Sequence, residues 1–131
     1  MTMILKNNIL IKEHELLDAG FLGACDAVAE TLGAEGKLAI LENSNTNEPP
    51  IVTKDGVTVA KSIQLKDPIE NIGAEIVKQA AIRSANTAGD GTTTTTLLAN
   101  KMVQEGLSKI RSGANAVEIK KGIDKAIKEV T

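Results

Sequence analysis

Residues 88–96 read Ala-Gly-Asp-Gly-Thr-Thr-Thr-Thr-Thr and lead into an apolar helical pattern that starts at Leu97. Threonine is a poor helix former, so five in a row would cost on the order of 3 kcal/mol relative to alanine. Binding of a phosphate group would explain the run. Glycine lets the backbone approach a ligand, the first amides of a helix point at an anion, and Asp90 can hold Mg²⁺ through oxygen. The simpler alternative is a tight turn in which Asp90 or Thr92 is a helix N-cap.

Two helices are predicted from this run onward. Residues 92–111 carry a helical pattern that Gly113 closes, and Asn115 with Glu118 forms a capping-box-like start for a last helix. In the first helix, the apolar side chains that we expect to face inward are Leu98, Met102, Val103, Leu107 and Ile110. In the second helix, the apolar stripe consists of Ile119, Ile123, Ala126, Ile127 and Val130.

Another helix start precedes the run. Asp67 is a candidate N-cap, Pro68 falls at the first helical position, and Glu70 lies three residues after the cap. The helix is expected to continue to about Asn86 along an apolar stripe. The stripe consists of Ile69, Ile72, Ile76, Ala80 and Ile82 or Arg83.

The first part of the chain predicts a helix over residues 13–31 that ends near Gly33. Apolar pairs and triplets at residues 4–5 and 9–11 could be a strand or the lead into this helix. Cys25 lies among small apolar neighbours on it, which predicts a buried thiol, and as the single cysteine it forms no internal disulfide.

A hairpin is predicted next. Residues 38–41 and 51–53 are short apolar strands, joined by a polar loop that contains two prolines. Asp55-Gly56 predicts a turn, and residues 57–65 fit either a strand or one helical turn. The fold class is therefore mainly α, with one small β-hairpin.

Length and composition narrow the possible functions. The 131 residues fit one domain, the formal net charge is −2, and Phe21 is the only aromatic residue. Nucleic-acid binding is therefore not expected, since neither a basic surface nor stacking side chains are available. No stretch resembles a signal peptide or a membrane span, so we expect no membrane partner and a soluble, cytoplasmic protein. The sequence also lacks the P-loop pattern and the third glycine of a dinucleotide fingerprint.

Taken with two further loops, the threonine run resembles the group I chaperonins, the GroEL-like family. The matching segments cover most of the chain from about Asp18 to Thr131 and occur in the family's order. They are residues 31–33 with Gly36-Lys37 (Thr-Leu-Gly, then Gly-Lys), residues 53–60 (Thr-Lys-Asp-Gly-Val-Thr-Val-Ala), residues 70–74 (Glu-Asn-Ile-Gly-Ala), residues 88–94 and residues 121–126 (Lys-Gly-Ile-Asp-Lys-Ala).

This resemblance implies the N-terminal part of a multihelical equatorial domain, with ATP and Mg²⁺ as cofactors. Asp90 would bind the Mg²⁺ that bridges the phosphates, Lys54 would approach the phosphates, and Asp55 would lie near the terminal phosphate as the catalytic residue. The remaining implied contacts are Thr31, Leu32, Gly33 and Ala34 along the adenosine and phosphate side, and Gly91, Thr92, Thr93 and Thr94 around the phosphates. The hairpin resembles the family's stem-loop, which contacts a neighbouring subunit.

Departures from the family limit these expectations. The family usually has proline at Ala34 and a basic residue at Glu35, so the turn is expected to be looser and more negative here. The first seventeen residues match poorly. The family chain is several times longer, so residues 1–131 correspond to a partial equatorial domain without the intermediate and apical domains. Unfolded clients and the co-chaperonin bind family segments outside it, and a homo-oligomeric ring is expected of the complete protein.

Three hypotheses follow from the sequence. The first is an ATP-driven folding chaperonin subunit, an ATPase by family, whose 131-residue part alone is weakly active or inactive. The second is a truncated chaperonin-like interaction protein that associates with a full-length ring and does not hydrolyse ATP by itself. The third, a stand-alone phosphate-binding enzyme, is disfavoured because the similarity extends well beyond residues 88–96.

Overall fold

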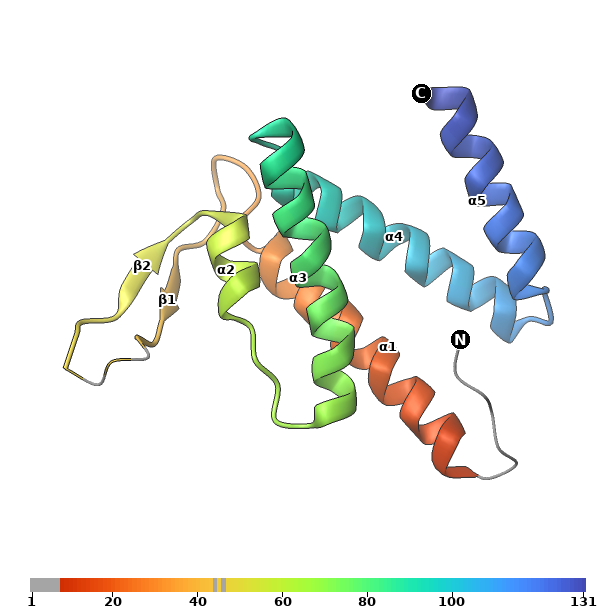
Figure 1. The fold of residues 1–131 in the computed structure, drawn as a ribbon, viewed down its shortest axis with the longest axis horizontal. Helices are drawn as coiled ribbons and strands as arrows, with labels where there is room; N and C mark the ends of the chain where they lie inside the picture. Colours follow the sequence, from red (N-terminus) through yellow and green to blue (C-terminus); the bar gives the residue numbers. More distant parts are fainter. Residues whose placement is uncertain (1–7, 44, 46) are drawn as a thin grey trace. The chain divides into compact units, whose positions relative to one another are not determined.

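Two long helices cross at a pair of glycines and form the centre of the first part of the chain (Figure 1). In the computed structural model, which describes residues 8–43, 45 and 47–131, α1 spans Asn8–Ala29 and α3 spans Pro68–Ala88. A Cβ at Gly20 would overlap the Glu70 carbonyl oxygen, and a Cβ at Gly73 would overlap the Leu17 carbonyl oxygen. The two backbones can therefore approach this closely only because both crossing positions lack a side chain.

A small hairpin and a short helix lie beside this crossing. Strand β1 (Ala39–Leu41) pairs antiparallel with β2 (Ile51–Thr53), with Ile40 opposite Val52. Helix α2 (Gly56–Ser62) follows and lies between the hairpin and α3 in Figure 1. The hairpin therefore leads directly into α2, and α2 contacts β1, α1 and α3.

Two more helices complete the described part of the chain. Helix α4 spans Thr92–Arg111 and α5 spans Ala116–Val130. The chain divides into two compact units within α4, the first ending at Asn100 and the second beginning at Lys101. In the second unit, Gly113 adopts φ +102° in the turn, and Asn115 caps α5 by accepting a hydrogen bond from the Val117 amide at 2.8 Å. The predicted cap at Asn115 is confirmed.

The core of the first unit is made mainly of small side chains. One cluster joins Ala24 and Cys25 of α1 to Ala74 and Val77 of α3, and Phe21 packs against it. Burial confirms the expected position of Cys25 and raises the pKa of its thiol to about 11, with a smaller contribution from the charge of Asp26. A second cluster consists of Val28, Val59, Ala60 and Ala81.

Most predicted elements are confirmed, with shifts at their ends. The helix predicted over residues 13–31 starts at Asn8, so residues 9–11 are its first turn, while residues 4–5 lie outside the described part. Residues 57–65, ambiguous in the sequence, are helical through Ser62. The turn predicted at Asp55-Gly56 is instead the start of α2, because the Asp55 side chain caps that helix.

The buried faces of α3 and α4 differ from the predicted apolar stripes. On α3, Ile72 is 56% exposed and Ile76 is 48% exposed, while the buried residues are Gly73, Ala74, Val77 and Ala81. The close crossing with α1 explains this, since a Cβ at Gly73 would already overlap the Leu17 carbonyl oxygen, and the larger Val77 is buried one turn further along α3. On α4, the aliphatic side chains expected inward are exposed at Leu98, Met102 and Ile110, and the buried residues are Thr92, Thr96 and Asn100.

The start of α3 follows from one side chain. Oδ1 of Asp67 accepts hydrogen bonds from the amides of Ile69 at 2.9 Å and Glu70 at 3.1 Å. We expect Asp67→Ala to lower the free energy of unfolding by about 1 kcal/mol, since both amides lose their acceptor. Urea unfolding measures this difference. Asp67→Ser restores an acceptor and should recover most of the loss, whereas equal losses in both variants would contradict the capping role.

Candidate functional site

Three segments that are distant in sequence meet near the start of α4. Thr31 follows α1, Gly56 begins α2, and Thr93 lies in the first turn of α4. The hydroxyl groups of Thr31 and Thr93 are hydrogen-bonded at 3.2 Å. A Cβ at Gly56 would overlap Oγ1 of Thr93 and would lie 3.6 Å from Oγ1 of Thr31. The structure therefore brings one residue from each of the three chaperonin-like loops into direct contact.

The first loop is a tight turn after α1. Thr31 is buried, and its hydroxyl donates to the Val28 carbonyl oxygen at 2.7 Å. The turn is closed by a hydrogen bond from the Lys37 amide to the Glu30 carbonyl oxygen at 2.8 Å, and the two side chains also form an exposed ion pair. Gly33 has φ +77°, a conformation that favours glycine.

The direction of the Thr31–Thr93 hydrogen bond follows from this geometry. A threonine hydroxyl carries one proton, and Thr31 gives its proton to Val28. Thr93 must therefore donate to Thr31 and use its own hydroxyl proton in doing so. While this bond is formed, Thr93 can offer an anion its backbone amide but not its hydroxyl proton.

The second loop caps α2 with a carboxylate. Oδ2 of Asp55 accepts from the amide of Thr58 at 3.0 Å and from its hydroxyl at 2.5 Å. The hydrogen bond from the Thr58 hydroxyl is the largest cause that lowers the pKa of Asp55 below its usual value, so this carboxylate is ionised at neutral pH. Lys54 is exposed between β2 and the cap.

The third loop joins α3 to α4 through two glycines with positive φ. Gly89 (φ +70°) ends α3, and Gly91 (φ +78°) precedes α4. The Thr95 amide donates to the Gly91 carbonyl oxygen at 2.8 Å, which places Gly91 at the N-cap position. The alternative that Asp90 or Thr92 is the N-cap is therefore wrong. Glycine at this position leaves the helix start without a side-chain cap.

The first turn of α4 has the properties of an anion site. By helix geometry, the amides of Thr92, Thr93 and Thr94 have no acceptor within the helix. They lie at the positive end of the helix dipole, which favours a phosphate. The carboxylate of Asp90, which is exposed, accepts from the Gly91 amide at 2.6 Å. A single carboxylate beside such a helix start fits Mg²⁺, which is commonly held by one or two carboxylates together with the phosphates of the nucleotide.

Other predicted site residues lie around this centre without a described contact to it. Leu32, Gly33 and Ala34 are exposed on the turn after Thr31. A hollow of about 460 Å³ adjoins this turn and includes Leu32 and Glu35 in its lining. The residue that sequence reasoning missed is Gly56, which it treated as part of an ordinary turn. Its signals in the sequence were its position directly after Asp55 and its place in the chaperonin-like segment of residues 53–60.

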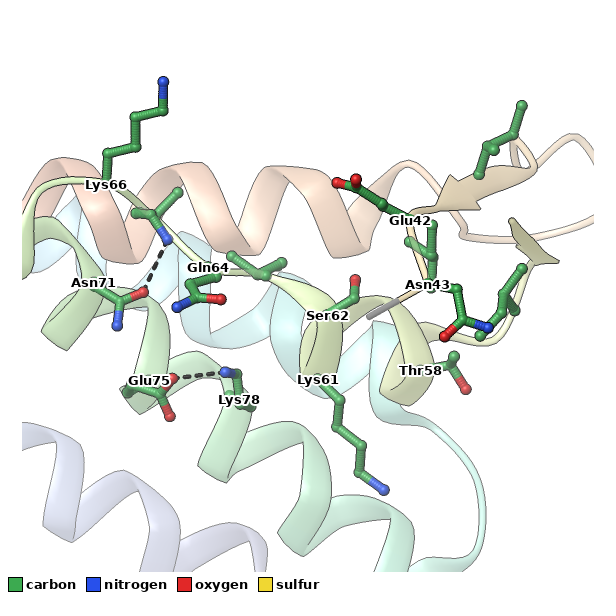
Figure 2. Close-up of a pocket in the computed structure, with 15 residues that line it drawn as sticks. Glu42, Asn43, Thr58, Lys61, Ser62, Gln64, Lys66, Asn71, Glu75 and Lys78 are labelled. Atoms are coloured by element: carbon green, nitrogen blue, oxygen red, sulfur yellow. Dashed lines mark hydrogen bonds and ion pairs between the residues drawn. The ribbon is translucent and has the colours of Figure 1, made fainter. Parts of the chain in front are cut away.

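A second depression adjoins the second loop at Thr58 but neither of the other two loops. This groove of about 1240 Å³ runs between the hairpin, α2 and the first half of α3 (Figure 2). Within it, Asn71 accepts from the Leu65 amide at 2.9 Å, and Lys78 pairs with Glu75 at 2.6 Å. Its lining contains neither Thr31 nor Thr93, so it is not the site predicted from the sequence. None of the helices in the described residues is both long and apolar enough to span a membrane.

Comparison with known proteins identifies the family. A model of the TCP-1/cpn60 chaperonin family matches residues 25–131. The chain belongs to this family. The 131-residue chain is 46% identical over 114 residues to the probable chaperonin-like protein PrmG of Gordonia sp. (strain TY-5). This match covers 87% of the 131-residue chain and 29% of PrmG.

A solved chaperonin structure confirms the fold. The crystal structure of the chaperonin gp146 from bacteriophage EL 2 (Pseudomonas aeruginosa), obtained in the presence of ATP-BeFx, matches with a TM-score of 0.62 and 28% sequence identity. The match covers 79% of this chain and 18% of the gp146 chain. The mainly helical fold with one small hairpin is thus part of a chaperonin equatorial domain, as the sequence predicted. The 131-residue chain spans less than a third of the length of PrmG and of gp146.

Proposed function

We propose that the three converging loops form the Mg-ATP site of an ATP-dependent protein-folding chaperonin subunit. The observation that carries this proposal is the contact between Thr31, Gly56 and Thr93. The chaperonin gp146 was crystallised in the presence of ATP-BeFx, which supports a nucleotide of this kind. ATP would bind with its phosphates at the start of α4 and its adenosine toward the turn that follows Thr31.

The residues supply binding groups rather than a complete catalytic apparatus. The amides of Thr92, Thr93 and Thr94 would bind phosphate oxygens, and Asp90 would hold Mg²⁺, which neutralises their charge. Lys54 would add a positive charge. Asp55 is ionised and already holds Thr58, so it would act near the terminal phosphate as a fixed negative group. We therefore expect weak or no ATP hydrolysis by residues 1–131 alone.

The complete protein would use this site to drive folding. We propose a homo-oligomeric ring in the cytoplasm that binds unfolded clients and a co-chaperonin through segments outside residues 1–131. A second possibility is association with a full-length ring without hydrolysis, and the hairpin could supply the subunit contact that it needs. Four of its large apolar side chains are exposed and available to another subunit, namely Leu38, Ile40, Ile51 and Val52.

Removal of the proposed metal ligand tests the nucleotide site. We expect Asp90→Ala to weaken Mg-ATP binding at least tenfold, about 1.4 kcal/mol, in titration calorimetry. Asp124→Ala is the matched control, because it removes one exposed carboxylate from α5 and should leave binding unchanged. EDTA should weaken binding by the original chain but should have little further effect on Asp90→Ala. Equal Mg-ATP affinity in the original chain and Asp90→Ala would refute the assignment.

A further inference from the structure

A stripe of polar residues, rather than aliphatic ones, is buried on the first part of α4. Thr92, Thr96 and Asn100 are spaced by four residues and therefore share one face of the helix. The Thr96 hydroxyl is satisfied within its own helix, by donation to the Thr92 carbonyl oxygen at 2.9 Å. Asn100 instead reaches another helix: its Nδ2 donates to Oδ1 of Asp26 on α1 at 2.9 Å.

Packing alone does not account for Asn100. The side chain is 6% exposed, and its Oδ1 is buried with no hydrogen-bond partner among the described residues. A buried carbonyl oxygen without a donor destabilises a fold, so an apolar side chain of similar shape would suit this position better. Its bond to Asp26 is therefore the feature that distinguishes asparagine from leucine here.

Among the described residues, two side-chain hydrogen bonds join α4 to α1 or to the turn that follows α1. One is Asp26–Asn100 and the other is Thr31–Thr93. Thr93 and Asn100 are seven residues apart, which places them about 10 Å apart along the axis and roughly 20° apart around it. These two hydrogen bonds lie on the same face of α4, one at each end of residues 93–100. Together they fix both the rotation and the axial position of the helix.

We propose that Asn100 is a positioning residue for the phosphate site and acts through its hydrogen bond to Asp26. The bond sets the rotation of α4 and thereby the direction of the free amides at Thr92, Thr93 and Thr94. A rotation of 20° moves a Cα at the 2.3 Å helix radius by about 0.8 Å. Displacements of this size matter in sites that bind through fixed geometry. The inference rests on the proposed binding of Mg-ATP at this end of α4.

A set of substitutions separates the hydrogen bond from charge and packing. Asp26→Asn and Asp26→Leu both remove the same exposed charge, but only the asparagine can still accept from Asn100. We expect Asp26→Asn to bind Mg-ATP within about twofold of the original chain. Mg-ATP affinity should fall about three- to tenfold in Asp26→Leu and in Asn100→Leu. The double variant should lose no more affinity than either single variant, because all three lack the same hydrogen bond. Ser112→Ala, which removes an exposed hydrogen bond to the Lys109 carbonyl oxygen at the other end of α4, is the control and should bind normally.

Hydrogen exchange gives a readout that does not depend on ATP. Asp26→Leu should speed exchange of the Thr95 amide severalfold while leaving the Val77 amide of α3 unchanged. Equal acceleration at both amides would show a general structural role and overturn the proposal. So would equal Mg-ATP affinities of Asp26→Asn and Asp26→Leu. If the original chain binds no Mg-ATP, the proposed function fails, and the exchange experiment still decides whether Asn100 positions α4.

Discussion

Gly20→Ala and Gly73→Ala are each expected to lower the free energy of unfolding by about 3 kcal/mol, the upper end of the range for overpacking. At Gly20 the added methyl group would overlap the Glu70 carbonyl oxygen, and at Gly73 the Leu17 carbonyl oxygen. Both obstacles are backbone atoms, so no side-chain rotation can make room. The helices would have to separate, and the packing of Ala24, Cys25, Ala74 and Val77 would loosen with them.

Gly23→Ala is the matched control on the same helix. Apart from the neighbouring backbone of α1, no atom of the described residues lies within 4 Å of a Cβ at this position. Because alanine is the better helix former, this substitution should raise the free energy of unfolding by about 0.5–1 kcal/mol. Urea unfolding of the three variants measures both effects. If Gly20→Ala and Gly23→Ala shifted the midpoint in the same direction, the close crossing of α1 and α3 would be wrong.

The sequence predicted the elements well because their signals are local. The capping sequence Asp67-Pro68-Ile69-Glu70 located the start of α3 to the residue, and α4 has the predicted bounds Thr92–Arg111. The apolar segment at residues 51–53 is β2. Each signal depends on neighbours within four residues, so no knowledge of the tertiary contacts was needed.

The buried faces were predicted less well, for a physical reason. Apolar periodicity favours large aliphatic residues, whereas a close helix crossing selects small ones. The buried face of α3 therefore runs through Gly73 and Ala74 rather than Ile72 and Ile76. On α4 the buried face runs through Thr92, Thr96 and Asn100, of which Asn100 is bonded to Asp26 of α1, while Leu98 is exposed. Neither selection can be read from one helix alone, because both depend on the partner.

The candidate site was predictable in part. The threonine run indicated a phosphate from its own residues, whereas the roles of Lys54 and Asp55 came from the resemblance to chaperonins. Contact between Thr31 and Thr93, 62 residues apart, required the fold. The capping of α2 by Asp55 and the close approach of Gly56 likewise required the three-dimensional arrangement. The nucleotide contacts themselves stay predictions.

Gly56→Ala is expected to have the largest effect on the proposed nucleotide site. Helix propensity alone favours alanine at this first position of α2. The added Cβ, however, would overlap Oγ1 of Thr93 and would also lie 3.5 Å from Cγ1 of Val28. The Thr93 hydroxyl would have to turn away from the added methyl group, which breaks its hydrogen bond to Thr31 and detaches the start of α4 from the turn after α1. We expect Mg-ATP affinity to fall at least tenfold and the free energy of unfolding to fall by about 1 kcal/mol or more.

A double-mutant cycle with Thr93→Ala distinguishes this mechanism from a general disturbance. Thr93→Ala removes the atom that obstructs the new methyl group, so the double variant should regain most of the stability lost in Gly56→Ala. The coupling free energy should be about 1 kcal/mol. Affinity for Mg-ATP should not recover, because the Thr31–Thr93 bond is absent in both variants. Gly122→Ala is the control and should leave affinity unchanged, because the added Cβ meets no atom of the described residues within 4 Å apart from the neighbouring backbone of α5. Strictly additive losses of stability would show that Gly56 and Thr93 do not restrain each other, and the contact that unites the three loops would then not hold the site together.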